Sequence, residues 1–200
     1  MLDTFGVDRR WCLVHSTHLS SGEIGRLAKS GAVAGLCPNT EANLGDGIFP
    51  LKSFLASDGR FAIDGDVAVA VDPAEELRAM EYSQRLTLRR RNVAASSAQP
   101  HTAARLWSLA AAGGAQALGL GAGAIVAGAR ADLIAIDTDH ISLAGRDGEQ
   151  ALDSYVFVAG RSTVRDVMVG GAWVVTDRHH AREDDSARDY RAAVSRILSQ

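Results

Sequence analysis

Residues 1–90 alternate short apolar runs with segments of mixed polarity, a pattern typical of strands that alternate with helices. We predict buried strands at 11–14 and 32–37, and a third that begins at 60–63. Buried parallel strands have continuous apolar runs, as these segments do. Strands that alternate with helices indicate βα units on one parallel sheet.

Helices are predicted between and after these strands. Ser20 stands three residues before Glu23, the spacing of a capping box, and therefore opens a helix that reaches about Lys29. The turn-rich segment 39–49 is predicted to be a loop, and long ordered loops are more often functional than idle. The other predicted helices cover residues 50–56 and 73–91, the second of which ends in a solvated run of arginines.

Beyond these units the pattern changes from helical to mostly β. A Ser/Ala-rich linker at 94–100 precedes a helix over 101–119, which Gly113-Gly114 interrupts. The dipeptide Gly170-Gly171 is a strong signal for a two-residue hairpin turn. The remaining predicted strands cover 131–137, 155–158, 164–169 and 172–176, and a final helix at 186–198 has one apolar face suited to docking on a larger body.

Composition narrows the functional class. The 200 residues include 24 acidic and 21 basic side chains, a net charge of −3, which argues against nucleic acid or an anionic membrane as the main partner. No apolar run reaches the roughly 18 residues of a membrane span, and the N-terminus does not resemble a secretory signal. The only cysteines, Cys12 and Cys37, indicate a reducing compartment rather than a disulfide framework. We therefore expect a cytoplasmic protein.

Polar residues follow each predicted strand at its carboxyl end, where βα folds form their sites. They are His15 with His18, then Asn39-Thr40-Glu41, then Asp64 with Asp66. A histidine and carboxylates on one rim could bind a metal or transfer protons. Each also has a structural alternative. His15 and His18 diverge unless the chain bends, Glu41 could hold the loop together, and Asp66 could cap a turn or helix.

Three longer stretches resemble the formimidoylglutamate deiminases of histidine degradation, a group within the amidohydrolase superfamily. They read WCLVHSTHL at 11–19, GAVAGLCPNTEANLGDGIFP at 31–50 and EELRAMEYSQRL at 75–86. The most specific part is CPNTEANLGDGIFP, because it is long and chemically uneven. The resemblance continues through GGAQALG, ARADLIAID and VRDVMVGGAWVVTDRHH, so it covers nearly the whole chain.

The resemblance implies an α/β fold and a reaction. The fold is the C-terminal part of a TIM-type (β/α)8 amidohydrolase barrel, strands six to eight, plus the C-terminal strands of the small β-sandwich domain. Since a complete barrel needs about 250 residues, the implied domains are a partial barrel at 1–120, closing sandwich strands at 121–180 and a C-terminal helix at 181–200. The implied reaction is the zinc-dependent hydrolysis of a small-molecule substrate, N-formimidoyl-L-glutamate, to N-formyl-L-glutamate and ammonia.

The same resemblance implies roles for individual residues. His15 matches the histidine that ends barrel strand six and orients the hydroxide or the substrate. Asp66 matches the aspartate that ends strand eight, a metal ligand that also shuttles protons. We therefore expect His15 and Asp66 to be catalytic and Asp66 to bind zinc. His18 and Glu41 are weaker candidates, for substrate binding or support of the loop.

Two departures from the family pattern limit these expectations. The family reads Gly-Ser-Asp-Ser-His around its aspartate, whereas this chain reads Asp64-Gly65-Asp66-Val67-Ala68, which changes the hydrogen bonding beside the ligand. The family's strand-one His-x-His, its strand-five histidine and its substrate-binding arginines match nothing in the chain, although a catalytic zinc usually has three protein ligands.

We therefore expect little activity from the chain alone. Three interpretations stay open: an N-terminally truncated hydrolase, one half of a split enzyme completed by an N-terminal half, and a non-catalytic association module. A partial barrel leaves strand edges unpaired, which favours self-association, for example as a homodimer.

Overall fold

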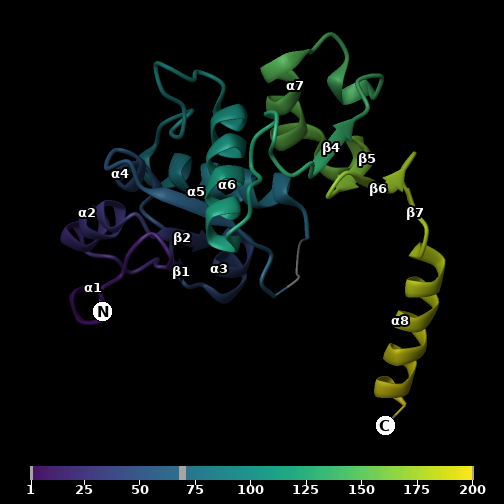
Figure 1. The fold of residues 1–200 in the computed structure, drawn as a ribbon, viewed down its shortest axis with the longest axis horizontal. Coiled ribbons are helices and arrows are strands. Elements are labelled where there is room, and N and C mark those ends of the chain that lie inside the picture. The colour runs from purple at the N-terminus through teal and green to yellow at the C-terminus, as the bar shows by residue number, and fades with distance from the viewer. Residues whose placement is uncertain (1, 68–70, 200) are drawn as a thin grey trace. The chain divides into compact units, whose positions relative to one another are not determined.

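The computed structural model of the chain describes residues 2–67 and 71–199, so Ala68 of the altered motif lies outside the described residues. The chain divides into two compact units (Figure 1). One runs to Arg130 and includes Thr138–Thr163, and the other combines Ala131–Asp137 with the chain from Val164 onward. The predicted family domains, with boundaries at 120 and 180, stay a prediction, because compact units need not coincide with them.

A parallel three-stranded sheet organises the first unit. Its strands are β1 (Cys12–Val14), β2 (Val33–Leu36) and β3 (Arg60–Ile63), in the order β1-β2-β3. Helices α2 (Ser21–Ser30), α3 (Pro38–Leu44) and α4 (Leu51–Leu55) connect these strands, and a short α1 (Leu2–Phe5) precedes them. The predicted alternation of strand and helix is confirmed, and with it the α/β class.

The burial of the strands corrects one expectation. Every residue of β2 is buried, as predicted, because β2 lies between two neighbours. In β1, by contrast, Cys12 and Val14 are exposed, the latter by 57%. The prediction of a buried first strand is wrong for this chain, since β1 pairs with β2 alone among the described residues.

Helix α3 replaces the loop predicted at 39–49. Pro38 occupies the first turn, where its missing N–H costs nothing. The carboxylate of Glu41 accepts a hydrogen bond from the Cys37 N–H, at 3.0 Å, and so satisfies a donor at the helix start. Gly45, with φ 72°, ends the helix in the left-handed conformation. Turn-forming residues in this segment therefore delimit a short helix, and only the residues after it form the loop.

Two long helices, α5 (Pro73–Leu88) and α6 (Thr102–Leu118), complete the α/β part of this unit. The segment between them contains no helix or strand but is tightly held. The buried Glu81 carboxylate accepts the Val93 and Ala94 N–H groups at 2.8 and 2.9 Å, and Arg105 donates to the Ala94 carbonyl at 2.7 Å. The predicted Ser/Ala linker is thus an anchored connection.

The predicted interruption of α6 at Gly113-Gly114 is wrong, because the helix continues through both glycines. Gly113 faces β3 so closely that an added Cβ would lie 1.8 Å from the Phe61 carbonyl oxygen. The glycine therefore permits a close approach of helix and strand. Gly114, next to it, has open space at the same position.

The strand predicted at 155–158 is also wrong. Helix α7 (Gly148–Ser154) continues directly into a π-helical turn, η2 (Tyr155–Ala159). Tyr155 is buried, and its ring meets Trp107 of α6 edge-on at 5.5 Å. Short apolar runs fit a buried helical turn as well as a strand. Two short 3₁₀ turns flank this region, η1 (Ile141–Leu143) and η3 (Gly160–Thr163).

The second unit is an antiparallel sheet followed by a helix. The sheet order is β4-β5-β6-β7. The predicted hairpin is confirmed, with Gly170 and Gly171 at φ 58° and 86° between β5 and β6. The strands are β4 (Leu133–Ile136), β5 (Val164–Val169), β6 (Ala172–Thr176) and β7 (His179–His180).

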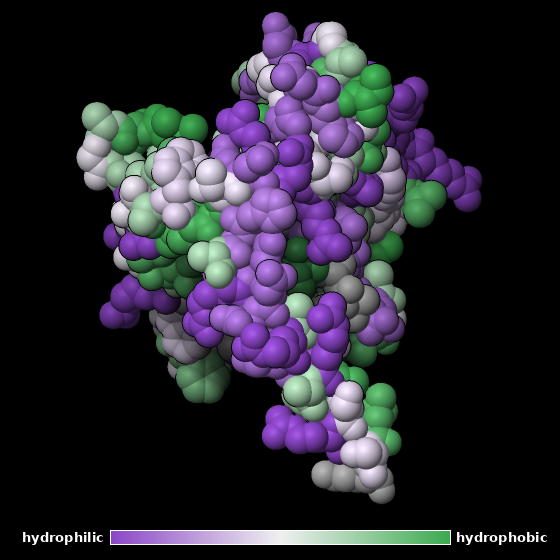
Figure 2. Space-filling model, turned by 90° about the vertical axis from the view of Figure 1, so that its right-hand side faces the viewer, coloured by the Kyte–Doolittle hydropathy of each residue, from purple (hydrophilic) through white to green (hydrophobic). Residues whose placement is uncertain are grey.

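Helix α8 (Glu183–Leu198) is the predicted C-terminal helix, begun three residues earlier than the predicted Ser186. None of its described residues is buried, and the same holds for the described residues of the sheet. Both hydrophilic and hydrophobic surface is visible on α8, which ends at the lower edge of Figure 2. Within the described ranges, no helix is long and apolar enough to cross a bilayer.

An ion pair joins α7 to the start of α6. His101 Nδ1 lies 2.6 Å from the Asp153 carboxylate, whose other oxygen accepts the Ala103 N–H at 3.0 Å. Glu149 lies 3.9 Å from His101 Nε2. The hydrogen bond with Asp153 raises the pKa of His101 above the ordinary 6.5, with smaller contributions from the charges of both carboxylates.

Substitution of the two glycines of α6 should have opposite effects. We expect Gly113→Ala to lower the free energy of unfolding by about 2 kcal/mol or more, because the new methyl group collides with backbone. Gly114→Ala, the matched control, should raise it by about 0.5–1 kcal/mol through helix propensity. Urea denaturation of both variants and the parent measures the difference. Equal effects would show that α6 does not lie against β3 as described.

The His101 pair should make stability depend on pH. Because the folded-state pKa is raised, its contribution is complete below pH 6.5 and is lost as the pH rises through the raised value. We expect His101→Gln to lower Tm most on the acid side of that window, and the gap to the parent to narrow as the pH rises. The difference between the two proteins isolates His101, since the pKa of His179 is raised as well. A gap that is constant with pH would contradict the assignment.

Candidate active site at the carboxyl edge of the parallel sheet

The carboxyl ends of β1, β2 and β3 lie at one edge of the sheet, and the segments that follow them bring three predicted site residues together. These residues are His15 after β1, Glu41 in α3 after β2, and Asp66 after β3. His15 lies between the two carboxylates.

A bend in the backbone orients His15. Its N–H donates to the Gly35 carbonyl at 2.7 Å, which extends the β1–β2 pairing by one residue. His15 and Ser16 then adopt left-handed conformations, with φ 61° and 52°. Such conformations cost energy for residues other than glycine and often occur at functional sites. The His15 side chain is one-third exposed, so a ligand can reach it.

Glu41 supports the ring from below the surface. Its side chain is only 5% exposed, and Oε1 lies 3.4 Å from His15 Nδ1. The same oxygen accepts the Cys37 N–H at 3.0 Å. A buried carboxylate needs such partners, because its removal from water is otherwise unfavourable.

Asp66 faces the opposite nitrogen of the ring. Its Oδ2 lies 3.7 Å from His15 Nε2, and its side chain is 46% exposed. The preceding residues are held to β2 by the Asp64 N–H, which donates to the Leu36 carbonyl at 3.0 Å. Asp66 itself has φ 35°, a further left-handed residue at this edge.

Thr40 is a buried residue with contacts to the Asp66 loop. Its hydroxyl lies 3.4 Å from the Gly65 carbonyl oxygen and 3.5 Å from the Val67 nitrogen. These contacts join α3 to the segment that carries Asp66. Sequence reasoning placed Thr40 at a strand end without a role, because a hydroxyl that spans two loops has no local signature.

His18 does not join the group. It is exposed and lines an open cleft of about 410 Å³ together with His15 and Asp46. Thr17 holds the far wall of this cleft by donating to the Asp46 carbonyl at 2.8 Å. Among the described residues, no hydrogen bond or ion pair connects His18 to Glu41 or Asp66. Both histidines therefore line one cleft, but only the His15 ring lies beside the Glu41 and Asp66 carboxylates.

Glu76 of α5 is the site-supporting residue that sequence reasoning missed. Its two oxygens accept hydrogen bonds from the backbone N–H and the side-chain amide of Asn39, both at 3.0 Å. Burial raises the pKa of Glu76, and the hydrogen bonds from Asn39 oppose that rise in part. It lies in the first turn of a helix and in the stretch 75–86 that resembles the family, but neither feature reveals a partner 37 residues away.

Burial also controls the thiol beside this group. Burial, together with the nearby carboxylates of Asp64, Glu41, Asp66 and Glu76, raises the pKa of Cys37 to about 12. A thiol with this pKa is neither a nucleophile nor a ready metal ligand near neutral pH. Cys37 is therefore a packing residue.

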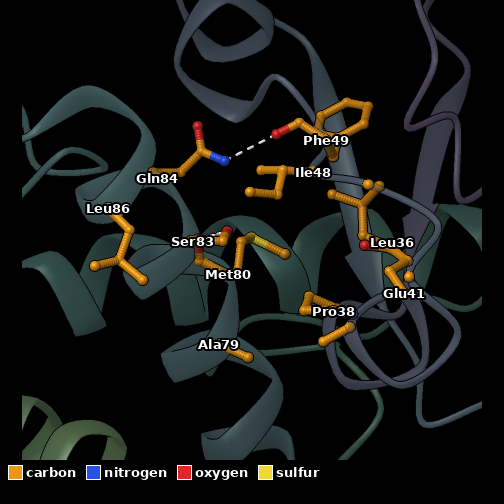
Figure 3. A pocket seen from close by; sticks show the side chains of 13 residues that line it. Leu36, Pro38, Glu41, Ile48, Phe49, Ala79, Met80, Ser83, Gln84 and Leu86 are labelled. Atoms are coloured by element: carbon orange, nitrogen blue, oxygen red, sulfur yellow. Dashed lines mark hydrogen bonds between the residues drawn. The ribbon is translucent and has the colours of Figure 1, made fainter.

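An apolar cavity of about 380 Å³ lies between α3, the loop after it and α5 (Figure 3). Leu36, Ile48 and Met80 line it, and Glu41 lies at one end. The Gln84 amide donates to the Phe49 carbonyl at 2.8 Å and so holds the loop against α5. The cavity therefore borders Glu41, the carboxylate beside the His15 ring, and offers few polar groups to a ligand.

The described residues do not by themselves make a zinc site. Within 2–67 and 71–199, no three His, Cys, Asp or Glu side chains converge closely enough to hold a metal ion. A catalytic zinc usually has three protein ligands. His15 and Asp66 are of suitable chemical type, but a metal bound there would need further ligands.

Comparisons with known proteins agree with this fold. The sequence model of the amidohydrolase family matches residues 4–174. The formimidoylglutamate deiminase of Pseudomonas aeruginosa is 48% identical over 99% of this chain, which spans 44% of that enzyme's length.

Solved structures give the same result. An amidohydrolase from Brucella melitensis superposes with a TM-score of 0.91 at 40% identity, over 98% of this chain and 43% of its own. An adenosine deaminase from Xanthomonas campestris, crystallised with bound zinc, is similar in fold, with a TM-score of 0.83 at 23% identity, over all of this chain and 48% of its own. The chain thus spans less than half the length of each of these proteins.

The two cysteines should differ in reactivity. We expect a thiol reagent at about pH 8 to label Cys12 slowly, because burial raises its pKa to some extent, and to leave Cys37 unlabelled in the folded chain. A Cys12→Ser variant should therefore take up no label until urea unfolds it. Rapid labelling of Cys37 in the folded variant would contradict the packing described for this edge.

Proposed function

The chain belongs to the amidohydrolase family, and from this premise we propose that it forms part of a deiminase that hydrolyses N-formimidoyl-L-glutamate. One water is consumed, the C–N bond to the terminal nitrogen breaks, and N-formyl-L-glutamate and ammonia are released. The observation that carries the proposal is the 48% identity, over nearly the whole chain, to the formimidoylglutamate deiminase of Pseudomonas aeruginosa.

The geometry of the edge supports this chemistry. Hydrolysis of a formimidoyl group requires a proton to leave the attacking water and another to reach the departing nitrogen. Histidine and carboxylate side chains are the usual groups for such transfers. His15 and Asp66, 3.7 Å apart on an accessible edge, are proposed to perform them, with Glu41 behind the ring. His18, in the adjoining cleft, is proposed to contact the substrate.

Zinc is the proposed cofactor of the assembled enzyme. The proposal draws on the family resemblance, and Asp66 is the residue of this chain that we propose as a ligand. Because the described residues lack a complete donor set, the other ligands must come from outside them.

Incomplete surroundings of the sheet support the need for further polypeptide. Among the described residues β1 pairs with β2 alone, and its Cys12 and Val14 are exposed. Unpaired strand edges favour pairing with another strand. We propose that a segment equivalent to the unmatched part of the relatives completes the barrel of which β1–β3 would be strands six to eight. That segment could belong to the same polypeptide or to a separate chain, and the adjacent coding DNA would distinguish the two.

A non-catalytic association module is the alternative. The observation that favours it is the altered motif around Asp66, in which Val67, 45% exposed, stands where the family has a serine. Polar groups beside a metal ligand orient it and tune the metal, so their loss favours a chain that does not catalyse.

Reconstitution tests the proposal. We expect this chain, co-expressed with the part of the Pseudomonas enzyme that it does not match, to release ammonia from N-formimidoyl-L-glutamate, and the chain alone to release little. In the assembled protein, Asp66→Asn and His15→Ala should each lower kcat by about 100-fold or more, as expected for lost acid–base groups. His15→Ala should retain bound metal better than Asp66→Asn.

His180→Gln, an exposed histidine in the second unit, is the matched control and should leave turnover unchanged. A folded but inactive assembly would favour the association module. Full turnover by Asp66→Asn would show that its assignment is wrong, and loss of metal first in His15→Ala would reverse the two roles.

A further inference from the structure

We propose that Glu41 is a positioning residue that holds neutral His15 as the Nδ1–H tautomer, which leaves Nε2 as a free acceptor at the accessible edge. The use of that acceptor in deamination rests on the proposed function, whereas the tautomer itself does not.

Two carboxylates lie on either side of the His15 imidazole ring. Glu41 Oε1 lies 3.4 Å from Nδ1 and Asp66 Oδ2 lies 3.7 Å from Nε2. A neutral imidazole carries one N–H, so it can donate to only one of them. Which nitrogen holds the proton is decided by the stronger partner.

Burial favours Glu41. Its side chain is 5% exposed, whereas that of Asp66 is 46% exposed. Charge–dipole interactions are stronger where water is excluded, and Asp66 can satisfy its oxygens with solvent. The shorter distance acts in the same direction.

Glu41 is also the better fixed of the two. Its Oε1 accepts the Cys37 N–H at 3.0 Å within the first turn of α3. The backbone that carries the ring is fixed in turn, because the His15 backbone N–H donates to the Gly35 carbonyl of β2. Both members of the pair therefore depend on β2, and neither needs to move to meet the other.

The consequence of this tautomer is a pair of neighbouring hydrogen-bond acceptors. With the proton on Nδ1, His15 Nε2 and Asp66 Oδ2 are two acceptors 3.7 Å apart, on side chains that are 33% and 46% exposed. Two acceptors at this separation favour a ligand that presents N–H donors. The formimidoyl group of the proposed substrate has such donors on its terminal nitrogen.

Nuclear magnetic resonance of the 200-residue chain, labelled with ¹⁵N-histidine, tests the tautomer. At about pH 9 an ordinary histidine is neutral, and a His15→Gln variant identifies the His15 signals. We expect a protonated Nδ1 and an unprotonated Nε2 in the parent. Glu41→Ala should shift His15 toward the Nε2–H form, and Glu41→Gln should restore the parent pattern, because its amide oxygen still accepts.

Asp66→Asn is the matched control, since it alters the other carboxylate and should leave the pattern unchanged. A parent that holds mainly Nε2–H, or a pattern that responds to Asp66→Asn and not to Glu41→Ala, would overturn the proposal. If Glu41→Ala does not fold, the spectra of the parent and of Asp66→Asn still show which nitrogen of His15 carries the proton. The measurement needs no substrate, so a failed reconstitution of deiminase activity would leave the tautomer result intact. A different tautomer would likewise leave the reconstitution result intact.

Discussion

The backbone pairing along β2 is the constraint on which the candidate site depends. The Gly35 carbonyl accepts the His15 N–H, and the Leu36 carbonyl accepts the Asp64 N–H. The positions at which the chain leaves the sheet after β1 and β3 are therefore set by this central strand. All four residues of β2 are buried, which protects these hydrogen bonds from water. The spacing between His15 and Asp66 therefore depends on the sheet as well as on the turns that follow its strands.

Buried carboxylates provide the second layer of order. Glu41 accepts the Cys37 N–H, Glu76 the Asn39 N–H, and Glu81 the N–H groups of Val93 and Ala94. In the sequence all three are ordinary charges, Glu41 in a predicted loop and Glu76 and Glu81 in a predicted helix. In the fold each holds the start of a helix or a connection that has no regular structure, where unpaired N–H groups would be costly.

The wrong predictions share a physical origin. β1 was expected to be buried, and residues 155–158 were expected to form a strand, because apolar runs report only a preference for burial. Whether a run is covered depends on its neighbours, and in the part of the chain that the structure describes β1 pairs with one strand where β2 pairs with two. The break predicted in α6 failed for a related reason. Gly113 is small because β3 lies against it, and the sequence of α6 alone carries no trace of that contact.

The sequence by itself determined the α/β class, most strand positions, the capping box of α2, the hairpin at Gly170-Gly171 and the residue types at the strand ends. Local rules suffice for these, since they depend on periodicity, caps and turn chemistry within a few residues. Only the tertiary structure decided that His15, Glu41 and Asp66 meet while His18 stands apart. Such meetings depend on parallel register and on left-handed turns at His15 and Asp66, which join segments far apart in the chain.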